Sequence, residues 1–272
     1  MERRPFSEVL KNAEVDIRRE YDRLYMMFYG ADSEEDMSYY EYCAQNFHSL
    51  PFRGTCISLK DFDEVHSFHF EPQPADFDLN YLVNFCEYLY NIVIFNQRPD
   101  FVFQSVYGGL PNIMMQIRGV IEKIGYMEAR SDMITIFVPK SQPAIVVSEL
   151  LPKDLSYKVI EYNHHSMKGD LKRKQATLKL LADQLEAKRK ELSGLNKSLA
   201  DDLFFLFNNV NVRHNNIDPQ AGSFNQPVAD MSEEELEQWY DDTYDTCLLA
   251  FMILDQAERK NKISELKKKI TP

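Results

Sequence analysis

Hydrophobic residues recur at three- and four-residue steps along most of the chain, and this spacing places them on one face of an α-helix. In residues 5–29 the pattern is regular and carries Phe6, Leu10, Ala13, Ile17, Tyr21, Leu24 and Phe28. The same spacing predicts further helices over residues 33–47, 78–97, 112–126, 144–151 and 155–165. Residues 78–97 are apolar nearly all round, so we expect this helix to be central.

The pattern changes to that of a β-hairpin over residues 126–139. Residues 133–138 are rich in β-branched side chains, and a turn is expected before them at residues 130–132. A shorter run, residues 52–57, is a candidate strand. The helix–hairpin–helix order resembles a winged helix, but no basic recognition helix accompanies it. A hairpin that covers one end of a helical bundle is therefore the preferred interpretation.

Leucines repeat every seven residues through the long helix expected over residues 170–213. They are Leu171, Leu178, Leu185, Leu192, Leu199 and Leu206, with Leu181 and Leu195 at the companion position of the heptad. The next step of the series reaches Arg213, so the seam that buries the leucines should also bury part of this arginine. Because a straight helix drifts from a strict heptad, it must supercoil or break, and Gly194 is the expected weak point. Packing within a bundle is preferred to an isolated coiled coil.

The last helix is expected from Ser232, which begins a capping box, almost to the end of the chain. Acidic residues crowd its first half and lysines its end, an order that suits the helix dipole. Asp241, Asp242 and Asp245 are interpreted as a solvated face rather than a divalent-ion site. They are also the candidate ion-pair partners of a buried Arg213, together with groups of a second subunit.

These elements predict a mainly α fold, an elongated helical bundle with one small β-hairpin. The chain has 272 residues, enough for two modules. We expect an N-terminal helical module with the hairpin over residues 1–152 and a C-terminal long-helix domain over residues 153–272. In the second domain, two long helices joined by a loop over residues 213–231 form an αα-hairpin suited to dimer packing.

Charge and cysteine content narrow the function classes. A net charge of −12 argues against broad, passive binding of nucleic acid. The four cysteines, Cys43, Cys56, Cys86 and Cys247, form no C-x-x-C pair, so we expect reduced thiols in a cytoplasmic protein. The first residues lack a signal-peptide pattern, and no apolar run is long enough to cross a membrane. We therefore expect no membrane association.

Motifs for a cofactor or a metal ion are absent from the sequence, so we expect neither. There is no Gly-rich phosphate loop, nucleophile elbow or complete zinc pattern. His66 and His69 have a spacing that would share a helical face, but nothing completes a metal site, so we interpret them as surface residues. His164 and His165 are adjacent and would point about 100° apart on a helix, which favours a capping or hydrogen-bonding role.

A cluster of polar side chains ends the apolar run of residues 203–210. The cluster comprises Asn208, Asn209, Arg213, His214, Asn215 and Asn216. An apolar anchor with a polar end is how a scaffold holds a site rigidly. The alternative is a helix C-cap, because Asn tolerates the left-handed conformation and cations complement the helix dipole.

At these residues the chain resembles the end of the signature helix of HEPN domains, which are helical modules of toxins and antiviral defence proteins. Their pattern is an Arg, a polar residue and, after a short spacer, a His. Arg213 and His214 match the first two positions, while Asp218, Pro219 and Gln220 stand where the His would be. In that family, paired Arg and His residues meet at a dimer interface and cleave RNA without a metal ion.

The resemblance implies two alternative functions. The first, which the density of Arg, His and Asn makes the preferred interpretation at this point, is a metal-independent ribonuclease or toxin subunit of a bacterial abortive-infection system. Arg213 would stabilise phosphate charge and His214 would act as general acid or base, while RNA would be oriented by Asn209, Asn215 and Asn216. The second is a non-catalytic sensor or protein-interaction module, in which the polar cluster joins two subunits or holds a protein partner. We expect a homodimer through the C-terminal helices.

Overall fold

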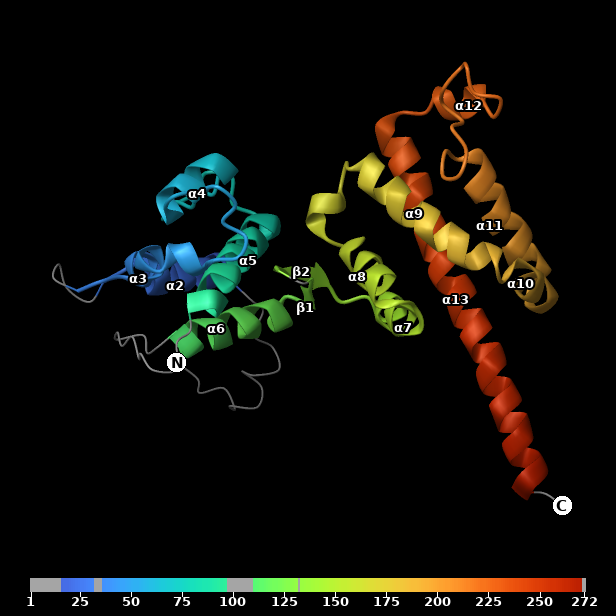
Figure 1. The fold of residues 1–272 in the computed structure, drawn as a ribbon, viewed down its shortest axis with the longest axis horizontal. Coiled ribbons are helices and arrows are strands. Elements are labelled where there is room, and N and C mark those ends of the chain that lie inside the picture. Colours follow the sequence, from blue (N-terminus) through green and yellow to red (C-terminus); the bar gives the residue numbers. More distant parts are fainter. Residues whose placement is uncertain (1–15, 32–35, 97–109, 132, 271–272) are drawn as a thin grey trace, which may run out of the picture. The chain divides into compact units, whose positions relative to one another are not determined.

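The computed structural model describes residues 16–31, 36–96, 110–131 and 133–270 (Figure 1). Regular structure in these residues is helical apart from one two-stranded β-hairpin, which confirms the mainly α fold. The chain divides into two compact units, Met1–Phe137 and Val138–Pro272. This division falls earlier than the boundary expected at residue 152, because α7 (Gln142–Leu150) packs against α8 (Lys153–Glu161) and α13 (Glu233–Ile270) of the second unit.

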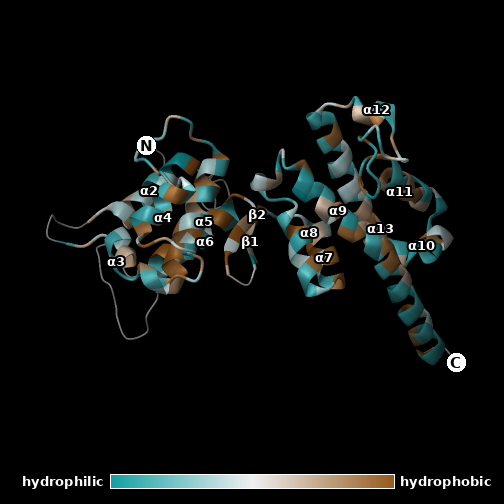
Figure 2. Ribbon diagram, turned by 45° about the horizontal axis from the view of Figure 1, so that its top comes forward, coloured by the Kyte–Doolittle hydropathy of each residue, from teal (hydrophilic) through white to brown (hydrophobic). Residues whose placement is uncertain are grey.

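The first unit is built on α5, with the other elements packed around it. Its elements are α2 (Ile17–Tyr29), α3 (Tyr39–Gln45), the short 3₁₀ helix η1 (Phe47–Ser49), α4 (Leu59–His66), α5 (Leu79–Asn96), α6 (Leu110–Lys123), β1 (Tyr126–Arg130) and β2 (Thr135–Pro139). Brown, hydrophobic ribbon gathers in α5 and α6 (Figure 2). As the sequence predicts, α5 is buried along most of its length, because apolar side chains cover most of its circumference. One narrow polar stripe is formed by Asn80, Asn84, Glu87 and Asn91.

Aromatic rings form much of the core of the first unit. Tyr21 of α2 lies 4.8 Å from Phe85 and 5.2 Å from Phe77, measured between ring centroids. Tilted rings at these distances are favourable beyond the apolar area that they bury. The hydroxyl of Tyr21 donates to the backbone carbonyl of Glu71 at 2.6 Å, so the buried polar atom has a partner.

Two local expectations for the first unit are wrong. The second helix begins at Tyr39, where Ser38 and Glu41 form a capping box, and not at residue 33. Residues 52–57 form turns rather than a strand. The interpretation of His66 and His69 as surface residues is confirmed, because both are exposed. His66 is the last residue of α4, since Ser67 adopts a left-handed conformation with φ of 58°, so the two imidazoles do not share a helical face. Residues 5–15 of the first expected helix lie outside the described residues.

The second unit is organised around α13. Besides α7 and α8, it contains the 3₁₀ helix η2 (His165–Met167), α9 (Leu171–Glu186), α10 (Arg189–Leu195), α11 (Lys197–Asn209) and α12 (Gln226–Ala229). Helix α13 packs against α7, α9, α10 and α11. The face that it buries is the one that the spacing predicts: Leu236, Tyr240, Tyr244, Cys247, Phe251 and Leu254.

The helix expected over residues 170–213 is broken into α9, α10 and α11. The second break follows Gly194 by two residues, at Asn196, whose side chain accepts from the backbone N–H of Leu199 at 3.1 Å. Half of the eight leucines in the heptad series, Leu178, Leu181, Leu185 and Leu192, are fully buried, whereas Leu195 is exposed. Because the helix is broken, α10 packs against α11, and all three helices pack against α13. The four buried leucines therefore contact other parts of the same chain.

All four cysteines are buried and free of disulfides. Burial raises the pKa of the Cys43 thiol to about 12, which keeps the thiol protonated and unreactive.

A buried carboxylate joins three helices of the first unit. Asp63 of α4 is only 7% exposed. Its two oxygens accept from Tyr88 of α5 at 2.9 Å and from Tyr40 of α3 at 3.0 Å. Burial raises the pKa of Asp63 from an ordinary value of 3.8 to about 6, although both hydrogen bonds act in the opposite direction.

This raised pKa predicts a pH dependence of stability. The folded state holds the proton of Asp63 more tightly than the unfolded chain does, so this group stabilises the fold fully below its ordinary pKa. The contribution is lost as the pH rises towards about 6. Urea unfolding at a series of pH values should show this loss in the wild type and not in Asp63→Asn. Glu64→Gln, at an exposed neighbour on the same helix, should keep the wild-type dependence of the free energy of unfolding on pH. If Asp63→Asn showed the same pH dependence as the wild type, Asp63 would not be its source.

Candidate functional site

The polar cluster at the end of α11 is held mainly by its asparagines. Asn211 adopts a left-handed conformation with φ of 59°. Its N–H donates to Oδ1 of Asn216 at 2.8 Å, and the N–H of Asn216 donates to Oδ1 of Asn211 at 3.2 Å. The Nδ2 of Asn216 also donates to the carbonyls of Asn208 and Ser223, at 3.1 and 2.8 Å. Asn216 is buried, so this reciprocal pair closes the loop after α11.

Arg213 is largely buried, as the extrapolated leucine seam predicts, with a side chain 16% exposed. Its Nη1 pairs with Glu186 of α9, and its Nη2 donates to the carbonyl of Ala182 at 2.7 Å. The guanidinium also lies 5.2 Å from the ring centroid of Phe207 and 5.7 Å from that of Phe204, within range of cation–π attraction.

The expected partners of Arg213 on α13 are wrong, because Glu186 takes that role. The hydrogen bond from Arg213 lowers the pKa of the Glu186 carboxyl and keeps it ionised. Helix α9 ends at Glu186, and the loop after α11 returns to this end. The ion pair therefore ties two segments of the broken heptad helix together.

The other predicted site residues do not converge on this guanidinium. His214 and Asn215 are exposed. Asn209 donates to the carbonyl of Phe205, one turn earlier in α11, at 2.8 Å. Asn215 donates weakly to Asp218 at 3.4 Å. The structure thus uses Arg213 and Asn216 for packing and leaves His214 and Asn215 on the surface.

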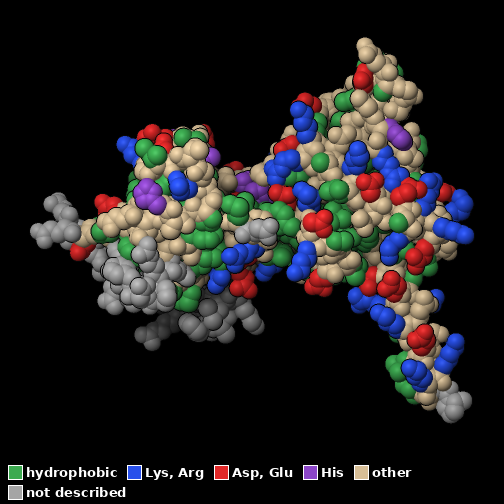
Figure 3. All heavy atoms as spheres, in the orientation of Figure 1, with side chains coloured by type: hydrophobic (Ala, Val, Ile, Leu, Met, Phe, Trp, Pro, Cys, Tyr) green, Lys and Arg blue, Asp and Glu red, His purple; other side chains and the backbone are tan. Residues whose placement is uncertain are grey.

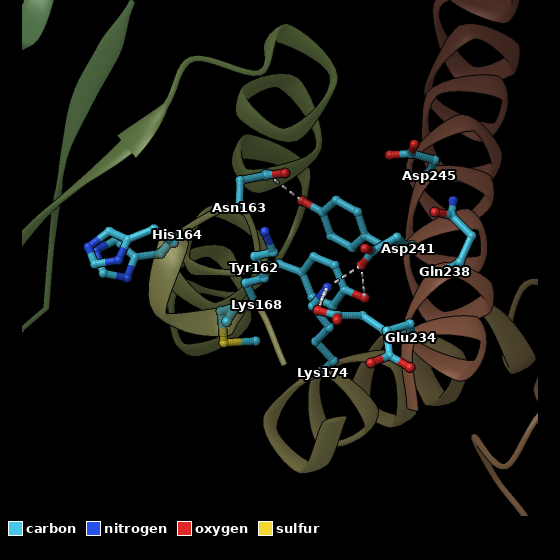
Figure 4. Close-up of a pocket in the computed structure, with 13 residues that line it drawn as sticks. Tyr162, Asn163, His164, Lys168, Lys174, Glu234, Gln238, Asp241 and Asp245 are labelled. Carbon is cyan, nitrogen blue, oxygen red and sulfur yellow. Dashed lines mark hydrogen bonds and ion pairs between the residues drawn. The ribbon is translucent and has the colours of Figure 1, made fainter. Parts of the chain in front are cut away.

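A polar cavity of about 520 Å³ lies elsewhere in the second unit, beside the first turns of α9 and α13 (Figure 4). At its base is Lys174 of α9, which is only 5% exposed. The Nζ of Lys174 lies 2.6 Å from Oδ1 of Asp241 and 2.7 Å from Oε1 of Glu237, both on α13. One buried cation is thereby neutralised by two carboxylates.

Two stacked tyrosines complete the wall of this cavity. The rings of Tyr162, which follows α8, and Tyr244 of α13 are nearly parallel, with centroids 4.0 Å apart. Tyr162 donates to Oδ1 of Asp241 at 3.0 Å, and Tyr244 donates to the carbonyl of Val159 at 2.7 Å. Burial and then the charge of Asp241 raise the pKa of Tyr162, so its hydroxyl stays a donor.

The charges in this cavity favour a structural clamp over acid–base chemistry. Burial opposes ionisation of Glu237, but hydrogen bonds from Lys174 and from the N–H of Gly169 hold the pKa of this carboxyl below its usual value. The side-chain nitrogen of Lys174 is engaged by both carboxylates, so it offers no free amine for nucleophilic attack. The network instead fixes α8 and α9 to α13.

Lys174 was missed as a key residue, although the sequence carries a signal for it. It occupies the companion position of the leucine heptad, at which Leu181 and Leu195 also fall. A lysine on an apolar seam requires a buried anionic partner. Asp241 was interpreted as part of a solvated face, but one of its oxygens is the partner that Lys174 needs.

Within each unit taken by itself, the described residues bring together no three His, Cys, Asp or Glu side chains close enough to hold a metal ion. None of the helices in the described part of the chain has the length and apolarity to cross a bilayer. No protein-family model, curated protein or solved structure matches the chain.

The clamp at Lys174 predicts a large loss of stability on its removal. Lys174→Met keeps the apolar stem but leaves Glu237 and Asp241 without their cation. Breaking a buried pair costs about 3–5 kcal/mol, and we expect the lower end because Asp241 reaches water. Urea unfolding measures the change. Lys172→Met, an exposed lysine of the same helix, should change stability by no more than about 0.5 kcal/mol; equal stability of the two variants would contradict the clamp.

Proposed function

We propose that this protein is a non-catalytic, HEPN-like helical module that works by binding a protein partner in bacterial antiviral defence. The observation that carries the proposal is the use of Arg213 inside the fold. A guanidinium that serves RNA cleavage must be open to a phosphate. Here it faces Glu186, the carbonyl of Ala182 and two phenylalanine rings.

The surroundings of Arg213 also oppose the approach of RNA. Glu186 carries a negative charge at the guanidinium, and a phosphate would have to displace it. The whole chain carries a net charge of −12, so attraction of RNA to this point would need a local basic surface. Glu186 instead places a negative charge beside Arg213, which repels phosphate.

A ribonuclease or toxin subunit is the second candidate, and the exposed His214 favours it. A surface imidazole next to an arginine could supply a general acid or base. That candidate requires the Arg213–Glu186 pair to open when RNA binds. It must also work without the second histidine of the family pattern, because Asp218, Pro219 and Gln220 stand at the expected positions.

The homodimer stays part of the proposal, but it needs a surface other than the one first expected. Leu178, Leu181, Leu185 and Leu192 are fully buried within one chain and have no area left for a second subunit. A dimer through the C-terminal helices must therefore use residues that the second unit leaves exposed.

Substitution of Arg213 separates the two candidate functions. Arg213→Ala should lower the free energy of unfolding by about 2 kcal/mol, between the values for buried and surface pairs, because Glu186 is 45% exposed. Neither the wild type nor the variant should cleave RNA in the presence of a metal chelator. Urea unfolding and gel-based RNA cleavage measure the two effects.

His214→Ala is the matched control, because this neighbour is exposed and should change stability by less than about 0.5 kcal/mol. Chelator-resistant cleavage by the wild type that Arg213→Ala abolishes without loss of stability would refute the non-catalytic proposal and favour the ribonuclease.

A further inference from the structure

The last turns of α13 project beyond the helices that pack against its first part (Figure 1). Helix α13 has 38 residues, and its buried residues end at Leu254. The 16 residues from Asp255 to Ile270 are mostly exposed yet still helical. An isolated helix of this length is marginally stable in water, and packing of an apolar stripe usually supports one.

The projecting segment carries such an apolar stripe. Ile263, Leu266 and Ile270 are 53%, 54% and 69% exposed. Their spacing of three and four residues places them on one face, as at the a and d positions of a coiled coil. Stepping back along the same heptad leads to Leu249, which is 45% exposed although it lies in the packed part of the helix. Gln256 and Arg259 occupy heptad positions between Leu249 and Ile263, so the continuous apolar stripe is confined to the projecting segment.

Charge is divided sharply between the two ends of α13. Residues 233–245 hold seven acidic residues and no basic one, whereas residues 258–270 hold six basic residues and two acidic ones. Of the seven, Glu237 and Asp241 pair with Lys174 within the chain, which leaves the remaining five for a partner. Figure 3 shows blue, basic side chains and a green, hydrophobic patch along the projecting end. Within one chain these two ends are far apart, because a helix rises about 1.5 Å per residue.

We infer that the exposed face of α13 binds a second copy of this chain in an antiparallel arrangement. An antiparallel pair sets the basic end of each helix beside the acidic start of the other, whereas a parallel pair would set like charges together. It also covers Ile263, Leu266 and Ile270 from water. The inference rests on the proposed binding function and names its partner.

The same surface fits RNA less well. Phosphates would satisfy the lysines but would leave the three apolar side chains between them exposed. The acidic first half of α13 would gain nothing from a nucleic acid, whereas a second copy uses both halves.

The test is the molar mass of the full chain in solution, measured by light scattering and sedimentation over a range of concentrations. The wild type should be a dimer. Ile263→Ser with Leu266→Ser should weaken the dimer at least about tenfold, because both copies lose two buried side chains. Leu180→Ser with Leu195→Ser, at similarly exposed leucines of α9 and α10, should leave the dimer intact.

Charge exchange tests the antiparallel arrangement. Lys260→Glu with Lys262→Glu should weaken the dimer, as should Asp242→Lys with Asp245→Lys, because each creates like-charge contacts. All four substitutions in one chain should restore it. Circular dichroism should show every variant still helical, since the residues are exposed.

A wild type that is monomeric at all concentrations would overturn the inference, as would a dimer that the Ile263 and Leu266 substitutions leave unchanged. Fluorescence anisotropy with a labelled single-stranded RNA gives the competing outcome: tail-dependent RNA binding by a monomer also overturns it. These outcomes are separate from the cleavage assay on Arg213. A monomer without nuclease activity would refute the binding of a second copy to α13 and would leave the non-catalytic proposal standing.

Discussion

A buried positive charge fixes the architecture of the second unit. Lys174 lies on a seam otherwise made of leucines, and an unpaired ammonium there would be strongly destabilising. Asp241 and Glu237 neutralise it from one side of α13, and Tyr162 shares the same carboxylate oxygen. Because these groups come from three segments, the requirement for neutrality sets where α8 and α9 meet α13. The apolar packing then follows from that alignment.

The same principle explains the polar end of α11. Arg213 extends the leucine seam, so it also needs an anionic partner, and the end of α9 supplies one through Glu186. The two largely buried cations of the seam, Lys174 and Arg213, are therefore used to hold helices together. A cluster that has the composition of a catalytic site thus has the contacts of a structural joint, and this is the basis on which we propose a binding function.

The seam and the surface of the second unit have separate roles. Leu178, Leu181, Leu185 and Leu192 of the seam are buried by folding within one chain. Helix α13 is longer than the core that it serves, and its excess length carries an apolar stripe with complementary charges at its two ends. A partner can bind only surface that folding leaves exposed. In the second unit this surface includes the end of α13 and not the buried part of the leucine heptad.

The sequence by itself determined most of the helices, the hairpin and the buried face of α13, because local periodicity and capping decide these within a few turns. It also placed Arg213 partly inside, since the seven-residue step is a property of the chain. It did not predict the short helices α4 and α12. Only the tertiary structure decided where the long helix breaks and which carboxylate each cation meets. Glu186, and not Asp241, pairs with Arg213, because ion pairing depends on which helices come side by side. Packing brings together side chains that are distant in sequence, and the spacing of residues along the chain does not predict which of them will pair.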